Sequence, residues 1–293
     1  QLIANLLMAE CLSAQNEYDS SISYFNKVIK SGKANKEQQM KAYYGLGYAQ
    51  YNLKQYEISY KNFSLLMSLN TSKNHLYFND AVLRAADCLF VLKRFNKAIS
   101  LYRKSNGNLG QEYASYQIAN IYYLKNELER AQKMFEDFIE IYSSSFLADN
   151  AIFQLGEILI DLEKFDLAIA NFNFFIDSYD KSALLPNVYE GRAVAHSNMN
   201  QWAQAAKDYY IILDNYLSHP IANEAILGLQ NIRNKGFEID DFDQYMSKLR
   251  TLDPNNASLE FISFEQLKND YFKQDYEPLI EGINSFRKIY PNT

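Results

Sequence analysis

The sequence predicts an all-α solenoid of about eight helical hairpins, and two observations favour it. Apolar and small residues recur with the three- and four-residue spacing of a helix face, as at Leu155, Gly156 and Leu159. This pattern also returns along the chain at intervals close to 37 residues, which indicates a repeat protein. With five prolines and ten glycines in 293 residues, the helices can run with few interruptions.

The clearest hairpin runs from Ala148 to Tyr179. Its first helix carries Gly156, and its second helix, after the short join 162–164, carries Ala168 and Phe172. Because the two small residues have little or no side chain, the helices can approach closely while the phenylalanine ring fills the space beside them. One hairpin has no closed core, so its remaining apolar side is expected to pack against a neighbouring hairpin.

Four positions of this hairpin recur in six repeats. A residue opens the second helix, a small residue precedes it by nine positions, another follows it by three, and a ring follows it by seven. The opening residues are Tyr18, Tyr56, Phe95, Leu128, Phe165, Trp202, Ile239 and Tyr276, and the last four intervals are 37 residues each by subtraction. We expect six regular repeats over residues 1–221, starting near residues 2, 40, 79, 112, 149 and 186.

Residues 222–293 are expected to hold two degenerate repeats, starting near residues 223 and 260, that continue the same solenoid. Gln230 and Phe242 replace the small residues in the seventh repeat, and Leu267 and Leu279 replace them in the eighth. Larger side chains at a close helix contact push the helices apart or change their crossing. We therefore expect irregular stacking in this part of the chain.

The small–small–aromatic pattern resembles the tetratricopeptide repeat, whose minimal unit has 34 residues. Leu155-Gly156, Phe165, Ala168 and Phe172 match it closely, although the closing proline of that family is missing from most repeats. The resemblance implies a right-handed superhelix whose first helices line the inner wall. The longer unit is similar to those of the periplasmic Tol-Pal coordinator and of the lipoprotein of the β-barrel assembly machine in Gram-negative bacteria. The Asn-, Tyr- and Phe-rich composition is compatible with Bacteroidetes.

Charge and hydropathy limit the classes of partner that we expect the chain to bind. The net charge of −6 and a pI near 5.3 disfavour nucleic acid, which binds basic surfaces. No apolar run approaches the roughly 20 residues of a membrane-spanning helix. Because the chain begins at Gln1 in the middle of a helical pattern, we expect it to be part of a longer protein, in which flanking sequence provides any membrane attachment.

The sequence shows no pattern typical of catalysis, and we expect no enzyme activity, cofactor or metal. His75, His196 and His219 are scattered, and no P-loop, G-x-G-x-x-G or G-x-S-x-G motif is present. Asp240, Asp241 and Asp243 lack the alternating ligands and the glycine of a calcium loop, so capping of a helix is the expected role.

The two cysteines occupy the same position of different repeats. Cys11 and Cys88 are two repeats apart, whereas a disulfide requires Cα atoms within about 7 Å. We expect two free and mostly buried thiols that behave as small hydrophobic residues.

The resemblance implies that partners bind the inner wall, and aromatic residues gather there in the second to fourth repeats. Tyrosine offers a large contact area with few rotatable bonds, which suits peptide binding. Alternatively, the rings pack against one another and against the next repeat. The candidate partner-binding residues are Tyr44, Tyr48, Tyr51, Asp80, Asp87, Phe90, Tyr113, Tyr116, Asn120, Tyr123, Phe153 and Glu157.

Three hypotheses for the function remain open. The first is a non-catalytic scaffold of a bacterial envelope, periplasmic or associated with the outer membrane, that binds protein or peptide partners. The second is an interaction or regulatory region of a longer cytoplasmic regulator or enzyme. The third, catalysis within the chain, requires a clustered polar pocket that the sequence does not display.

Overall fold

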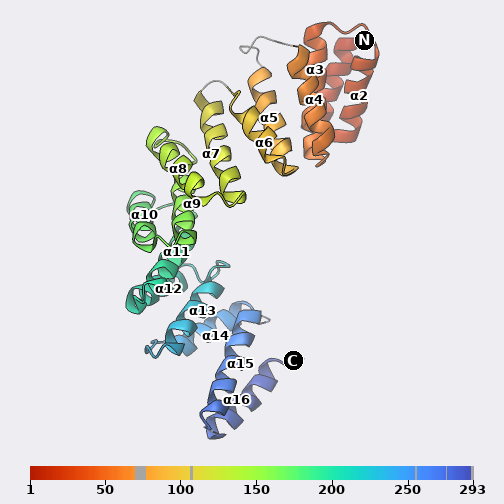
Figure 1. The fold of residues 1–293 in the computed structure, drawn as a ribbon. Coiled ribbons are helices and arrows are strands. Elements are labelled where there is room, and N and C mark those ends of the chain that lie inside the picture. Colours follow the sequence, from red (N-terminus) through yellow and green to blue (C-terminus); the bar gives the residue numbers. More distant parts are fainter. Residues whose placement is uncertain (70–76, 106–107, 255, 275, 292–293) are drawn as a thin grey trace. The chain divides into compact units, whose positions relative to one another are not determined.

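The computed structural model describes residues 1–69, 77–105, 108–254, 256–274 and 276–291, which form sixteen helices and no strand. The chain consists of two compact units, Gln1–Ala148 and Asp149–Thr293. In each unit, consecutive helices pack in pairs (Figure 1). The predicted all-α solenoid is therefore confirmed, whereas its right-handed sense and its division into six regular and two degenerate repeats stay predictions.

The first unit contains α1 (Leu2–Ala14), α2 (Tyr18–Lys30), α3 (Lys36–Asn52), α4 (Tyr56–Leu69), α5 (Phe78–Val91), α6 (Phe95–Tyr102), α7 (Asn108–Leu124) and α8 (Leu128–Ile141). The second contains α9 (Ala148–Asp161), α10 (Phe165–Ser178), α11 (Leu185–Asn198), α12 (Trp202–Asn215), α13 (Ala222–Asn234), α14 (Phe242–Leu252), α15 (Ala257–Phe272) and α16 (Tyr276–Ile289). Odd-numbered helices are the first helices of the hairpins and even-numbered helices are the second.

Each hairpin turn contains a residue in the left-handed region. In seven hairpins this residue stands two positions before the second helix; these residues are Asn16, Lys54, Lys93, Asn126, Glu163, Asn200 and Gln274, with φ between 56° and 64°. In the fifth hairpin the turn is closed by the Lys164 amide, which donates to the Leu159 carbonyl at 2.8 Å. This geometry fixes where the second helix begins, and it explains why seven of the eight predicted opening residues are the first residues of their helices.

The seventh hairpin differs, and the prediction that its second helix opens at Ile239 is wrong. The helix begins at Phe242, because the longer turn has two left-handed residues, Gly236 (φ 92°) and Asp241 (φ 54°). Ile239 keeps its apolar role from within this turn, where it packs against the core of the second unit.

The ring of Phe172, on the second helix of the fifth hairpin, joins two hairpins. A Cβ built on Gly156 would stand 2.5 Å from Phe172 Cζ, and one built on Gly191 would stand 2.7 Å from the same atom. Phe172 is fully buried between these two glycines, which lie on α9 and α11. The predicted close approach within a hairpin is confirmed, and the same ring also packs against the next hairpin. Within the second hairpin, a Cβ built on Gly47 of α3 would likewise stand 2.6 Å from Phe63 Cζ of α4.

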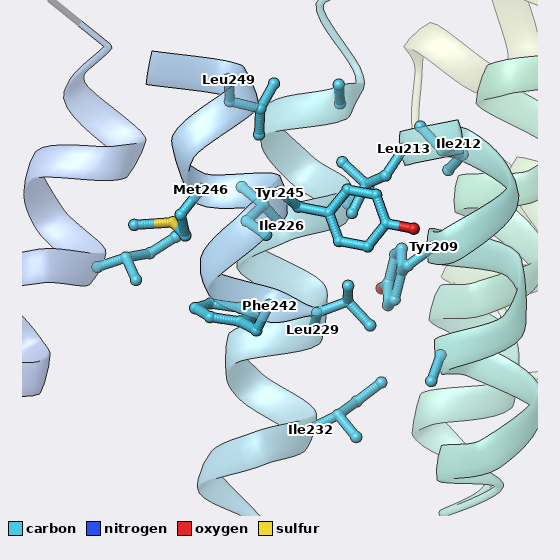
Figure 2. Packing of buried hydrophobic residues seen from close by; sticks show 14 of the residues in the cluster. Tyr209, Ile212, Leu213, Ile226, Leu229, Ile232, Phe242, Tyr245, Met246 and Leu249 are labelled. Atoms are coloured by element: carbon cyan, nitrogen blue, oxygen red, sulfur yellow. The ribbon is translucent and has the colours of Figure 1, made fainter. Parts of the chain in front are cut away.

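The core of the second unit continues through the less regular repeats. Figure 2 shows Tyr209 and Ile212 of α12 facing side chains of α13 and α14, among them Leu229 and Phe242. Gln230, which replaces a small residue here, is buried beside them.

The eighth hairpin reverses the order of large and small side chains. Leu267, which stands where regular repeats have Gly or Ala, reaches from α15 to α16. There it packs at Gly282, whose added Cβ would lie 2.5 Å from Leu267 Cδ2. The large residue is thus on the first helix and the small one on the second, the opposite of Gly156 and Phe172.

The two cysteines are free, but only one is buried. Cys88 of α5 packs beneath α4, its Sγ lies 3.3 Å from Ser59 Oγ, and burial raises the pKa of its thiol to about 11. The prediction that Cys11 is mostly buried is wrong, because it is exposed. Cys88, at the equivalent position of its repeat, is covered by α4, whereas no described helix covers Cys11 in this way.

Candidate functional site

The predicted partner-binding residues lie on the first helices, and we call this set the first-helix surface. Three come from α3, three from α5, four from α7 and two from α9. All twelve are half-buried except Asp87, which is buried. The ten residues on α3, α5 and α7 belong to the first unit, and the two on α9 belong to the second, so each group is described by itself.

In the first unit, Asp80 joins two neighbouring hairpins. Tyr44 and Tyr48 of α3 both donate their hydroxyls to Asp80 Oδ2 on α5, at 2.9 and 2.6 Å. Their ring centroids lie 4.9 Å apart, and the ring of Tyr48 also packs edge-on against Phe63. Burial, with the Asp80 carboxylate adding to it, raises the pKa of Tyr44 to about 12. These phenols therefore stay protonated as donors and hold the second hairpin to the third.

Asp87 lies about two helical turns after Asp80 on α5, and it forms a second contact between neighbouring hairpins. Its Oδ1 accepts from Tyr102 at 2.6 Å and from Tyr113 at 3.0 Å, and its Oδ2 lies 2.5 Å from Arg84 Nη1. The side chain of Asp87 is 5% exposed, and burial raises its pKa above the usual value although Arg84 and Tyr102 favour the charged form. Asp87 therefore holds the third and fourth hairpins together and is not accessible to a partner.

Arg84 links the two junctions. Its Nε lies 3.6 Å from Asp80 Oδ1, and its guanidinium stands 5.4 Å from the centre of the Tyr113 ring. Negative charge nearby, above all that of Asp87, raises its pKa, while burial opposes this effect. The result is one polar network across α3, α5, α6 and α7, in which the aromatic hydroxyls are already occupied.

Sequence reasoning missed Arg84 and Tyr102, although one signal was available for Tyr102. It stands at the ring position of its repeat, where Phe63 and Phe172 have no hydroxyl. A buried tyrosine hydroxyl requires a hydrogen-bond partner, so the hydroxyl itself indicates a buried acceptor nearby. No spacing in the sequence identifies that acceptor as Asp87.

The remaining rings of the first unit pack mainly within their own hairpins. Tyr51 meets Tyr56 at 5.3 Å, Phe90 meets Phe95 at 6.1 Å, and Tyr116 lies 5.7 Å from the rings of Phe135 and Phe138. Asn120 and Tyr123 lie half-buried on α7. The alternative that rings pack against each other thus describes much of this surface, while their half-exposed edges stay available.

In the second unit, Glu157 and Glu190 are half-buried carboxyls on successive first helices, α9 and α11. Glu157 Oε1 would stand 3.1 Å from a Cβ at Gly191, which places the carboxyl of α9 against α11. Burial raises the pKa of Glu157 to about 7, and the charge of Glu190 adds to this effect. Burial raises the pKa of Glu190 to about 6, with a contribution from Glu224.

No described residue forms a hydrogen bond or an ion pair with either carboxyl. Arg192, two residues after Glu190 in the sequence, pairs instead with the buried Asp208, through Nε at 2.9 Å and Nη2 at 2.6 Å. Sequence reasoning identified Glu157 but missed Glu190, although a signal was available, because Glu190 stands at the repeat position of Phe153, one of the predicted residues. Phe153 itself is half-buried on α9.

The described residues contain no group of three or more His, Cys, Asp and Glu side chains that could hold a metal ion. His196 packs within its hairpin, with Nδ1 2.6 Å from Gln201 Oε1, and His75 lies outside the described residues. Within the part of the chain that the structure covers, no helix has both the length and the apolar character to span a membrane.

A tetratricopeptide repeat model matches residues 4–31 and 113–145. No curated protein matches the sequence. The fold is similar to that of the C-terminal part of a TPR repeat-containing protein from Cytophaga hutchinsonii, with a TM-score of 0.70 and 16% identity over 88% of this chain and 98% of that one.

Two further solved structures have a similar fold. A tetratricopeptide repeat protein from Parabacteroides merdae has a TM-score of 0.59 and 16% identity, over 89% of this chain and 96% of its own. PilF of Pseudomonas aeruginosa has a TM-score of 0.53 and 15% identity, over 78% of this chain and 99% of its own. The chain therefore has the helical-repeat fold of tetratricopeptide repeat proteins, and two of its segments match the repeat itself.

Proposed function

We propose that the chain is a non-catalytic protein–protein interaction scaffold that holds protein or peptide partners on its first-helix surface. We place it in a bacterial cell envelope, in the periplasm or associated with the outer membrane. The observation that carries the proposal is the composition of the first helices, taken unit by unit. The first unit holds its aromatic rings rigidly, and the second unit has carboxyls without a partner among the described residues.

The aromatic part suits binding because it is already ordered. Tyr44, Tyr48 and Tyr113 are fixed by their hydrogen bonds to Asp80 and Asp87. A partner that packs on these rings restricts few additional rotamers, which lowers the entropy cost of association. Since the hydroxyls are occupied, the rings offer their edges and faces rather than hydrogen bonds.

The carboxyl part defines the charge of the partner. Glu157 and Glu190 are half-buried and have no cation beside them among the described residues. A lysine or arginine of a partner would stabilise their charged forms and lower their pKa values. Charge complementarity of this kind contributes specificity and fast association. We therefore propose that a partner bound on the second unit carries basic side chains.

The envelope location rests on the resemblance of the repeat unit, about 37 residues long, to envelope repeat proteins. The full-length sequence tests it directly. A signal peptide followed by a lipidated cysteine supports the envelope assignment, whereas an attached cytoplasmic output domain supports the alternative, a regulatory region of a longer protein.

The binding proposal is tested by affinity capture from a lysate of the source organism. The immobilised wild-type chain is compared with the double variant Glu157→Gln/Glu190→Gln, and Glu281→Gln on exposed α16 is the matched control. We expect partner binding to the double variant to weaken about fivefold to tenfold, equivalent to roughly 1 kcal/mol, and to stay unchanged for the control. Equal binding by the double variant and the wild type would contradict the proposed role of these carboxyls.

A further inference from the structure

A pocket of about 430 Å³ lies where the turns of the third and fourth hairpins meet in the first unit. Its lining, which we call the basic pocket, consists of Lys93, Arg94, Phe95, Asn96, Lys97 and Lys125. Lys125 comes from the turn between α7 and α8, and the other five residues come from the turn before α6 and from the first residues of that helix. Four cations thus gather in one place on a chain whose net charge is −6.

Two carboxylates of the protein neutralise part of this charge. Arg94 Nη1 lies 2.9 Å from Glu57 Oε2 on α4, and Lys125 Nζ lies 2.5 Å from Glu127 Oε1 in its own turn. Glu127 also pairs with Arg130 Nη1 at 3.3 Å, so its charge is shared between two cations. Neither carboxylate is therefore left to balance the other two lysines of the pocket.

Lys93 and Lys97 keep their positive charge without a counter-charge. Both side chains are exposed, and neither forms an ion pair with a described residue. They do not stabilise α6, because the N-terminal end of a helix favours negative charge and the first turn of α6 contains no acidic residue. The fold of the third hairpin therefore does not explain these two lysines, and an anionic partner would.

The size and composition of the basic pocket favour a short acidic peptide segment over nucleic acid. Nucleic acid binds surfaces on which many basic residues contact successive phosphates, whereas here the cations are confined to one pocket with Glu57 and Glu127 beside it. An ammonium group is a compact charge with three donors, which suits a carboxylate. The half-buried ring of Phe95 offers an apolar contact between these charges.

We propose that the basic pocket binds an acidic segment of a partner protein. Two carboxylates of the segment pair with Lys93 and Lys97, and an apolar side chain beside them packs on Phe95. The proposal is independent of partner binding on the first-helix surface, because none of the residues that line the basic pocket belongs to that surface.

Binding is measured by fluorescence anisotropy of a labelled, acetylated and amidated peptide, Glu-Glu-Leu-Glu-Glu, titrated with the complete 293-residue chain. The control peptide has glutamine in place of each glutamate. We expect saturable binding of the acidic peptide and about tenfold or more weaker binding of the control. Binding should also weaken as the salt concentration rises from about 0.05 to 0.3 M, because salt screens exposed charges.

The double variant Lys93→Gln/Lys97→Gln removes the two lysines that have no counter-charge, and we expect it to weaken binding of the acidic peptide about fivefold or more. Lys33→Gln/Lys36→Gln is the matched control, since it removes the same charge from two exposed lysines between α2 and α3. This control should bind as the wild type does. Because all four lysines are exposed, both variants should keep the circular dichroism spectrum of the wild type.

Several results would overturn the proposal. Absence of saturable binding, or equal affinity for the two peptides, would remove the role of the carboxylates. Equal weakening by both double variants would show an effect of overall charge and not of the basic pocket. Vesicles of phosphatidylglycerol and phosphatidylcholine test the alternative of a lipid surface: vesicle binding that requires Lys93 and Lys97, without peptide binding, would assign the pocket to lipid instead.

Discussion

Replacing Glu157 by glutamine should change how the stability of the chain depends on pH. In the folded chain, the carboxyl lies against α11, and its pKa is about 7 compared with an ordinary value of 4.5. Burial is the main cause, and the charges of Glu190 and Asp161 add to it. The folded state binds this proton more tightly than the unfolded state does. The proton therefore contributes fully to the free energy of unfolding below pH 4.5, and this contribution is lost as pH rises through 7.

The size of this effect follows from the two pKa values. A tenfold change in proton affinity corresponds to about 1.4 kcal/mol, so the difference between 4.5 and about 7 sets an upper bound of about 3 kcal/mol. Partial exposure of the side chain and coupling to Glu190 reduce the expected effect to about 1–2 kcal/mol. Glutamine keeps the shape of the side chain and removes its charge, so it should not lose this stability at high pH.

The assay is urea unfolding at pH 4 and pH 8, followed by circular dichroism. We expect Glu157→Gln to match the wild type at pH 4 and to exceed its free energy of unfolding by about 1–2 kcal/mol at pH 8. Glu281→Gln, at an exposed carboxyl of the same unit, should follow the wild type at both pH values. If Glu157→Gln showed the same pH dependence as the wild type, the raised pKa of Glu157 in the folded chain would be refuted.

Three further predictions concern packing, hydrogen bonding and turns. Gly156→Leu should lower the free energy of unfolding by about 1–3 kcal/mol or more, because the Phe172 ring occupies the space that the leucine side chain requires. An unchanged melting midpoint would argue against this packing. Tyr102→Phe should lower the free energy of unfolding by about 1–3 kcal/mol in chemical denaturation, since it removes a donor to a buried carboxylate. A loss below about 0.5 kcal/mol, which is the usual scatter of surface substitutions, would contradict this. Glu163→Gly should gain about 0.5–1 kcal/mol, since glycine tolerates the left-handed turn, whereas Glu163→Ala should gain nothing.

Much of the fold could be predicted from the sequence because it depends on local spacing. Gly156, Ala168 and Phe172 stand at positions set by helix geometry, so their contact within one hairpin follows from their order in the chain. The double role of Phe172, which also packs against Gly191, could not be predicted in the same way. It depends on the angle at which the next hairpin stacks, and no single repeat encodes that angle.

The seventh hairpin shows where local spacing fails. Ile239 keeps the 37-residue period, so the pattern places it at a helix start. In the structure its apolar side chain contributes to the core from a turn, and the helix begins only after the left-handed Asp241. A hydrophobic period in the sequence indicates which residues pack against the core. Ile239 does so without being part of a helix.

The polar network was less predictable than the fold. Asp80 and Asp87 could be placed on the first-helix surface, but several of their partners depend on contacts between hairpins. Tyr48 precedes Asp80 by 32 residues, and Tyr113 follows Asp87 by 26. Such pairs have no fixed spacing, because each requires the three-dimensional placement of two stacked hairpins. The tyrosines therefore turned out to be structural donors as well as candidate contact residues.

Photo-crosslinking shows whether partners bind the first-helix surface. Phe153 on α9 and Phe174 on α10 belong to the same hairpin; the first lies on the proposed surface, and the second is 53% exposed on the other helix. Each is replaced in turn by p-benzoylphenylalanine, and the chain is irradiated with its captured partner. The account predicts a crosslinked partner from position 153 and none from position 174. Crosslinking from position 174 alone would contradict it.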